Sequence, residues 1–221
     1  MYRAIIFDMD GTITDTEQIW HQAFRLLLER RNIALDKQKE HHILCTITGM
    51  GLIEKCAAIK EHTGIDEDVE LLAREKLDIA KELYGQHVKL MDGFADFHQK
   101  LKERQVKTGV ATNADDETLE ITKKSLNLSV FFGDHIYGIS RVNNMGKPNP
   151  AIYLHAAQKL EVEPEECIAI EDSAHGINAA RSAGMFCIGF NATGLDEQVE
   201  RAHMSVRSYK EIDLDRLLAR D

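Results

Sequence analysis

Short apolar runs that end in polar residues recur along this chain, and they constrain its fold more than any other feature. Longer segments with helical spacing, such as Ala151 to Leu160, separate most of these runs. Strands that alternate with helices build βαβ units around a parallel sheet, and near-continuous apolar strands fit a sheet that is covered on both faces. The pattern therefore predicts an α/β fold with a parallel sheet. The runs are AIIFD (4–8), TGVATN (108–113), HIYG (135–138), CIAIED (167–172) and FCIGF (186–190).

One region breaks the alternation of strands and helices. From about Thr16 to Val88 the sequence shows helical patterns and no strand signal, with expected breaks at TITGMG (46–51) and HTGID (62–66). This segment is far longer than the few residues that usually connect a strand to a helix. We therefore expect residues 16–88 to form a helical insert over the carboxyl end of the first strand. Residues 1–15 and 89–221 would form the core.

The composition and charge of the chain exclude several classes of partner and location. The 221 residues carry a formal net charge of -10, which argues against nucleic acid as a partner. The N-terminus carries acids where a signal peptide needs apolar residues, and no run approaches the length of a membrane span. The four cysteines lack C-x-x-C spacing, so we expect thiols in a reducing compartment rather than disulfides or a zinc site. We therefore expect a cytoplasmic monomer without a membrane partner.

The stretch FDMDGTITDT, at residues 7–16, follows the first apolar run directly and places Asp8, Asp10 and Asp15 around Gly11. Carboxylates this close repel one another, and removing them from water is costly unless a cation shares the site. The stretch therefore predicts a bound cation at the end of the first strand.

Further polar residues end other apolar runs. Because ligands of open α/β sheets bind beyond the carboxyl ends of the strands, we expect these residues to meet at one edge. Oxygen ligands favour Mg²⁺ over zinc, and a carboxylate beside a metal suits the formation of an aspartyl phosphate. Thr112 could hold phosphate oxygens, and Lys147, just before a helix that Pro148 is expected to start, could neutralise charge. The expected set is Asp8, Asp10, Thr112, Asn113, Lys147, Glu171 and Asp172.

Four motifs carry a resemblance to a known family. FDMDGTITD resembles the first signature of the haloacid dehalogenase superfamily of phosphohydrolases. TN (112–113), GKPNP (146–150) and IEDSAHGINAARSAG (170–184) resemble its second, third and fourth signatures, in the expected order. Taken singly, each motif also fits a turn, a helix cap or a surface lysine. Together, they favour the functional interpretation.

The resemblance implies a Rossmann-like three-layer core, an inserted helical cap and Mg²⁺-dependent phosphoryl transfer to a small phosphate ester. It implies that Asp8 is the nucleophile, that Asp10 is the general acid and base, and that Lys147 neutralises charge. Thr112 and Asn113 would bind substrate. The metal site would comprise Asp8, Asp10 and Asp172, with or without Glu171.

The small helical insert resembles the cap of the β-phosphoglucomutase-like branch, so Trp20, Gly49 and Met50 are expected to contact substrate. In the mutases of this branch a histidine stands where this chain has Trp20, and an arginine grips the second phosphate. The corresponding loop, TITGMGLIEK, has no arginine. We therefore predict a phosphatase for a sugar or polyol phosphate. A sugar-phosphate mutase is the alternative, and a non-enzymatic phosphate-sensing regulator is the third possibility.

Overall fold

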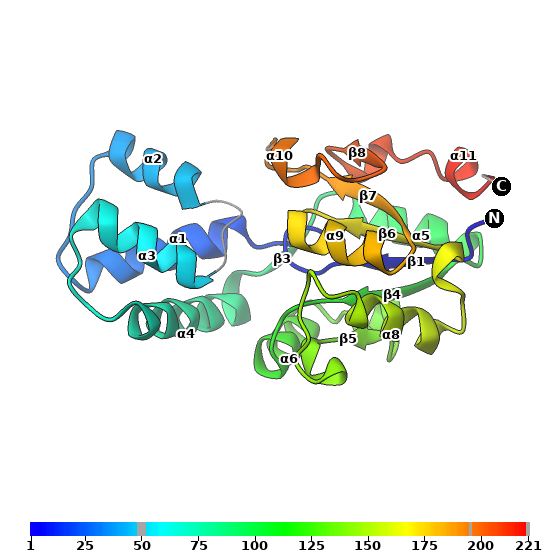
Figure 1. Cartoon of the computed structure of the whole chain (residues 1–221), viewed down its shortest axis with the longest axis horizontal. Coiled ribbons are helices and arrows are strands. Elements are labelled where there is room, and N and C mark those ends of the chain that lie inside the picture. Colours follow the sequence, from blue (N-terminus) through cyan, green and yellow to red (C-terminus); the bar gives the residue numbers. More distant parts are fainter. Residues whose placement is uncertain (48–51, 195, 220–221) are drawn as a thin grey trace. The chain divides into compact units, whose positions relative to one another are not determined.

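The computed structural model describes residues 1–47, 52–194 and 196–219 of the chain (Figure 1). The chain divides into two compact units: residues 1–15 together with 89–221, and residues 16–88. We call the first the core unit and the second the helical unit, and each is described by itself.

The core unit is built on a six-stranded sheet with the order β5-β4-β1-β6-β7-β8. Every neighbouring pair in it is parallel, which confirms the predicted α/β fold with a parallel sheet. Its strands are β1 (Ala4–Phe7), β4 (Lys107–Ala111), β5 (Ile136–Tyr137), β6 (Cys167–Glu171), β7 (Phe186–Phe190) and β8 (Met204–Val206).

Helices cover both faces of this sheet, so the core unit has three layers (Figure 1). Successive side chains of a strand point to opposite faces, and in β1 Ile5 and Phe7 join one apolar cluster while Ala4 and Ile6 join the other. The first cluster is closed by α5 (Phe94–Glu103), α6 (Asp116–Ser125), α7 (Ser129–Phe132), η3 (Tyr209–Glu211) and α11 (Leu214–Leu218). The second is closed by η1 (Ile139–Val142), α8 (Ala151–Leu160), α9 (Ala174–Ser182) and α10 (Asp196–Val199). The short η2 (Pro164–Glu166) leads into β6.

The register of the central strands decides where their ends lie. Phe7 of β1 stands level with Val110 of β4 and with Ile170 of β6. Because the strands are parallel, the residues that follow all three emerge at the same side, which we call the carboxyl edge.

Three details of the core unit differ from the sequence prediction. The helix after Lys147 begins at Ala151 rather than at Pro148, and the Asn149 side chain accepts a hydrogen bond from the Ala151 N–H. A two-residue antiparallel pair, β2 (Thr14–Asp15) with β3 (Lys89–Leu90), lies where the chain leaves and re-enters the core unit. The edge strand β8 has no counterpart among the predicted runs.

The helical unit consists of α1 (Glu17–Glu29), α2 (Lys37–Ile47), α3 (Leu52–Thr63) and α4 (Val69–His87). No strand occurs within its described residues, 16–47 and 52–88. The helices end near the predicted breaks, and a further break after α1 was not predicted. Arg31 closes this turn with ion pairs to Glu67 (2.7 Å) and Glu75 (2.6 Å).

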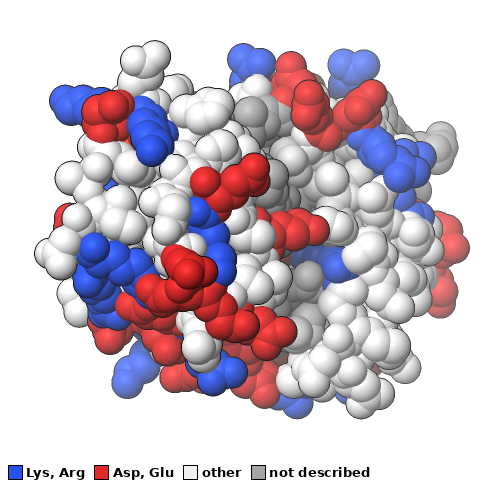
Figure 2. Space-filling model, turned by 60° about the vertical axis from the view of Figure 1, so that its left-hand side comes forward, with Lys and Arg blue, Asp and Glu red and all other residues white. Residues whose placement is uncertain are grey.

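Charged side chains of both signs are intermingled on the face shown in Figure 2. Within the described ranges, none of the helices combines the length and apolarity that a membrane crossing requires.

Candidate active site

A buried ion pair stands at the centre of the carboxyl edge. Asp8 follows β1 directly, and Lys147, from the loop before α8, donates a hydrogen bond from its Nζ to Asp8 Oδ1. Both side chains are almost fully buried, with 3% of the lysine and 10% of the aspartate side chain exposed. A buried charge needs a partner, so this pairing explains why a surface-type residue such as lysine is found in the interior.

Glu171, the last residue of β6, binds Lys147 and two further residues. Its Oε1 accepts hydrogen bonds from Lys147 Nζ at 2.5 Å and from the Tyr153 hydroxyl at 2.8 Å. Its Oε2 accepts from the Ser173 backbone N–H at 3.2 Å and from the Ser173 hydroxyl at 3.0 Å. The carboxylate is fully buried, and four protein donors occupy its two oxygens. It therefore fixes the ammonium group that faces Asp8.

Asp172 brings a third carboxylate to this place. Oxygen atoms of Asp8, Glu171 and Asp172 lie within 4.8 Å of one another. The backbone of the first loop approaches Asp172 so closely that a Cβ at Gly11 would lie 2.1 Å from its Oδ2, and Gly11 has a φ of +83°. Only glycine meets both conditions without strain. The first motif thus needs its glycine to admit the last acid of the fourth motif.

The charges in this cluster do not balance. Burial raises the pKa of the Asp8 carboxyl to about 7; Lys147 opposes the shift, while Glu171 and Asp10 add to it. Burial, Asp8 and Glu171 together hold the pKa of Asp172 well above its usual range. For Lys147, burial would lower the pKa, but the attraction of Asp8 and Glu171 outweighs it and raises the pKa. Carboxylates thus outnumber ammonium groups, and a divalent cation would favour their ionised forms.

Asp10 lies two residues after Asp8, in the turn that precedes β2. The Thr14 hydroxyl donates to Asp10 Oδ1 at 3.4 Å and also reaches the Met9 carbonyl oxygen at 3.0 Å. Asp10 is only partly buried. Its side chain is therefore held in the turn that directly follows Asp8, at a half-buried position.

Thr112 and Asn113 follow β4 on the other side of β1. The Thr112 hydroxyl accepts a hydrogen bond from the Ala114 N–H at 3.1 Å, and the residue is buried. Asn113 Oδ1 accepts from the backbone N–H of Lys147 at 2.9 Å. Asn113 therefore positions the loop that carries Lys147, a role that the sequence did not suggest.

The remaining predicted site residues lie in the helical unit. Trp20 packs edge-on against Tyr84, with ring centroids 6.4 Å apart, and Lys76 Nζ lies 4.7 Å from the centre of its ring. Within the helical unit, then, Trp20 has packing partners of its own. Gly49 and Met50 lie outside the described residues.

Two residues that contribute to this site were not predicted from the sequence. Tyr153 binds Glu171 through its hydroxyl, and its ring lies 5.1 Å from Lys147 Nζ. Ser173 caps α9 by accepting from the Gly176 N–H, and its hydroxyl also donates to Glu171. The signal for Ser173 was its place directly before a predicted helix, which is where caps occur. Tyr153 gave no signal, since an aromatic residue on a buried helix face is ordinary core.

Comparison with known proteins places this arrangement in a family. Residues 2–184 match the haloacid dehalogenase-like hydrolase family. The chain is 31% identical over 183 residues to a phosphorylated carbohydrates phosphatase of Thermotoga maritima, covering 82% of each chain. It is 29% identical over 224 residues to the β-phosphoglucomutase of Bacillus subtilis, covering 97% of this chain and 93% of the relative. A solved haloacid dehalogenase-like protein from Agrobacterium tumefaciens superposes with a TM-score of 0.82, at 25% identity, over 99% of this chain and 98% of that one. The family match spans most of the sequence, and the predicted resemblance is confirmed: this chain belongs to the haloacid dehalogenase-like hydrolases.

Proposed function

We propose that this protein is a Mg²⁺-dependent phosphatase that hydrolyses a small phosphate monoester, with a sugar or polyol phosphate as the substrate class. The observation that carries the proposal is the buried Asp8 carboxylate, which pairs with Lys147 beside Asp172 and stands two residues from the half-buried Asp10. A pure phosphate binder needs neither a nucleophile nor a neighbouring acid. The set therefore favours catalysis over sensing.

The proposed reaction has two steps. In the first, an oxygen of Asp8 attacks phosphorus, the bond to the ester oxygen breaks, and Asp10 gives its proton to the departing alcohol. In the second, Asp10 takes a proton from water, which attacks the same phosphorus and releases inorganic phosphate and free Asp8. Lys147 stabilises the negative charge on the phosphoryl oxygens in both steps.

The donor set fits a Mg²⁺ ion. Carboxylate oxygens from Asp8 and Asp172 are hard ligands, and the described residues place no histidine or cysteine in this cluster. When bound there, Mg²⁺ supplies positive charge that stabilises the phosphoryl group. Because four protein donors already occupy the oxygens of Glu171, we propose that Glu171 anchors Lys147 and leaves direct ligation to Asp8, Asp172 and the region of Asp10.

We propose that the helical unit acts as a cap that selects the substrate. Trp20 is its expected contact residue, together with Gly49 and Met50. The relative from Thermotoga maritima, a phosphorylated carbohydrates phosphatase, supports a sugar phosphate as the substrate class.

A β-phosphoglucomutase-like mutase is the second candidate, because the Bacillus subtilis mutase matches nearly the whole chain. A mutase must grip a second phosphate, and guanidinium is the natural group for that task. The segment 46–55 has no arginine, and Trp20 replaces the mutase histidine. Both departures favour the phosphatase.

Release of inorganic phosphate from a panel of sugar and polyol phosphates tests the proposal. Mg²⁺ should support turnover, chelation with EDTA should stop it, and Ca²⁺ should not restore it, because its looser coordination disturbs in-line geometry. Full activity in excess EDTA would refute the metal site.

A second incubation separates hydrolysis from isomerisation. Glucose 1-phosphate with a trace of glucose 1,6-bisphosphate should yield free phosphate or no reaction. Glucose 6-phosphate that accumulates far faster than free phosphate would identify a mutase.

A further inference from the structure

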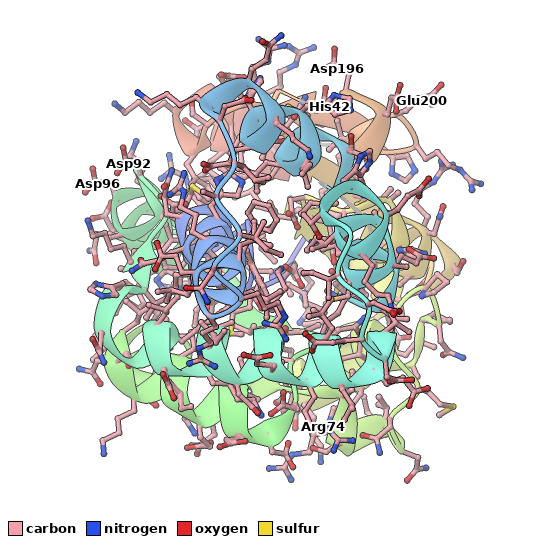
Figure 3. All side chains as sticks on the ribbon, turned by 90° about the vertical axis from the view of Figure 1, so that its left-hand side faces the viewer. His42, Arg74, Asp92, Asp96, Asp196 and Glu200 are labelled. Atoms are coloured by element: carbon pink, nitrogen blue, oxygen red, sulfur yellow. The ribbon has the colours of Figure 1, made fainter. Side chains whose placement is uncertain are left out.

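One face of α2 gathers side chains of the kind that bind transition metals. His41, His42 and Cys45 all project from it, and all three are exposed. Successive helical residues are rotated by about 100°, so Cys45 projects between the two histidines, about 40° from His41 and about 60° from His42. His62, near the end of α3, is half-buried and lies beside His42. We call these four residues the α2–α3 cluster; His42 is labelled in Figure 3.

The first pair in the cluster already has the spacing of two metal ligands. Cys45 Sγ lies 3.6 Å from His41 Nε2. Zinc bonds of about 2.3 Å to sulfur and about 2.05 Å to nitrogen, at the tetrahedral angle, place the two ligand atoms about 3.6 Å apart. A helical i, i+4 pair also holds its two ligands on one rigid element, which lowers the entropic cost of binding.

The second pair links α2 to the next helix. The rings of His42 and His62 stand at 89° with centroids 5.6 Å apart. Two imidazoles that ligate one tetrahedral zinc ion have centroids about 5 Å apart, given Zn–N bonds of about 2 Å. Among the described residues, the one trio of histidine, cysteine or acid ligand atoms within 4.8 Å of one another is Asp8, Glu171 and Asp172. The α2–α3 cluster therefore consists of two pairs that are linked through the neighbouring residues His41 and His42 of α2. Binding of one ion by all four side chains requires rotation of the exposed α2 side chains and of the half-buried His62.

We propose that the α2–α3 cluster is a binding site for a zinc-type transition-metal ion, with Cys45, His41, His42 and His62 as its ligands. The lack of C-x-x-C spacing hid this site, because here the ligands come from a helical repeat and a neighbouring helix. Thiolate and imidazole are softer donors than carboxylates, so the cluster selects a different metal from the acids at the carboxyl edge. The site ties α2 to α3 within the helical unit.

The remaining thiols do not compete for the ion. Cys56, Cys167 and Cys187 are buried, and burial raises the pKa of each thiol above its usual value. Only the Cys45 thiol is therefore accessible to a metal ion, so a spectroscopic signal of sulfur ligation can be assigned to Cys45.

Titration of the full, reduced and metal-free chain with Co²⁺ tests the proposal, because cobalt replaces zinc and reports thiolate ligation as a near-ultraviolet charge-transfer band. We expect the band to saturate at one equivalent, to vanish when Zn²⁺ is added, and to persist in excess Mg²⁺. Cys45→Ser should abolish it. Because even outer-shell partners are worth about 10- to 100-fold in metal affinity, His41→Ala and His62→Ala should each weaken binding by at least that factor.

Two controls separate this site from other binding. His87→Ala removes an exposed histidine of α4 outside the cluster and should leave the band unchanged. Asp8→Asn should also keep the band, since that acid belongs to the other site. Absence of a thiolate band, its survival in Cys45→Ser, or unchanged affinity in His62→Ala would each overturn the proposal.

Discussion

At the scale of single residues, the candidate site depends on how Glu171 holds Lys147. Each oxygen of this buried carboxylate accepts two hydrogen bonds, and one of the four donors, Tyr153, comes from the interior of α8. Tyr153→Phe leaves the packing intact and removes one donor from a buried charge. We expect the free energy of unfolding to fall by about 1–3 kcal/mol, measured by urea denaturation.

Tyr137→Phe is the matched control for this substitution. Its hydroxyl pairs with His135 Nδ1 at 2.9 Å rather than with Glu171, in a contact that is only partly buried. If the free energy of unfolding falls no more in Tyr153→Phe than in the control, Glu171 does not depend on the Tyr153 hydroxyl.

The buried Lys76 of α4 should make the stability of the protein depend on pH in the alkaline range. Burial, followed by the like charge of Lys55, lowers its pKa from 10.5 to about 8. Between these two pH values the unfolded chain binds more protons than the folded chain, so this residue makes stability rise with pH. Below about pH 8 both states carry the charge, and the folded state bears the full cost of burying it.

The measurement is the free energy of unfolding of wild type relative to Lys76→Met, followed from pH 7 to 10.5. We expect the free energy of unfolding of the wild type to rise relative to that of the variant as the pH increases above about 8. The relative gain should reach about 3 kcal/mol, because each pKa unit corresponds to about 1.4 kcal/mol. Lys39→Met, at an exposed position, should run parallel to wild type. A flat difference for Lys76→Met would contradict the lowered pKa.

At the scale of elements, the start of α9 is built around the same carboxylate. A Cβ at Gly176 would lie 1.7 Å from Glu171 Oε1, so position 176 in the first turn of this helix has room for glycine alone. Gly to Ala inside a helix ordinarily stabilises by about 1 kcal/mol. Here Gly176→Ala must displace Glu171 and with it Lys147, so we expect lower stability and a loss of phosphatase activity.

His175→Ala, in the same turn but exposed, provides the control and should be close to neutral. Melting temperature and steady-state phosphate release check both variants. A Gly176→Ala protein that is more stable and fully active would show that Glu171 is not fixed by this turn.

The elements also show how far sequence reasoning reached. The central strands were predictable because a buried parallel strand must be apolar throughout, as in CIAIED, and their polar ends located Asp8, Thr112 and Asp172. The edge strand Met204–Val206 and the two-residue strands β2 and β3 contain polar residues, so none of them forms an apolar run of the kind that predicted the other strands. Tyr153 and the anchoring role of Asn113 depend on contacts between distant segments, which one-dimensional spacing does not encode.

At the scale of the whole molecule, the chain divides into a core unit and a helical unit, and we propose that the helical unit selects the substrate while the core unit carries out the chemistry. If the helical unit is a cap, Trp20→Phe should change the ratio of kcat/KM values between two phosphate esters while the melting temperature changes little. The measurement is a comparison of kcat/KM across the ester panel. If kcat/KM instead falls equally for every ester, and the melting temperature falls as well, Trp20 serves only to pack against Tyr84.

The central claim is that Asp8 is the nucleophile, and steady-state phosphate release by Asp8→Asn tests it most directly. Asparagine has nearly the same shape but cannot form the aspartyl phosphate, so turnover should vanish while circular dichroism shows an intact fold. Asp15→Asn, in β2 of the same segment, should keep its activity, and Asp10→Asn should lose about 10²–10⁴-fold. Phosphate release by Asp8→Asn within about tenfold of wild type, equivalent to a barrier change of less than about 1.4 kcal/mol, would contradict the account.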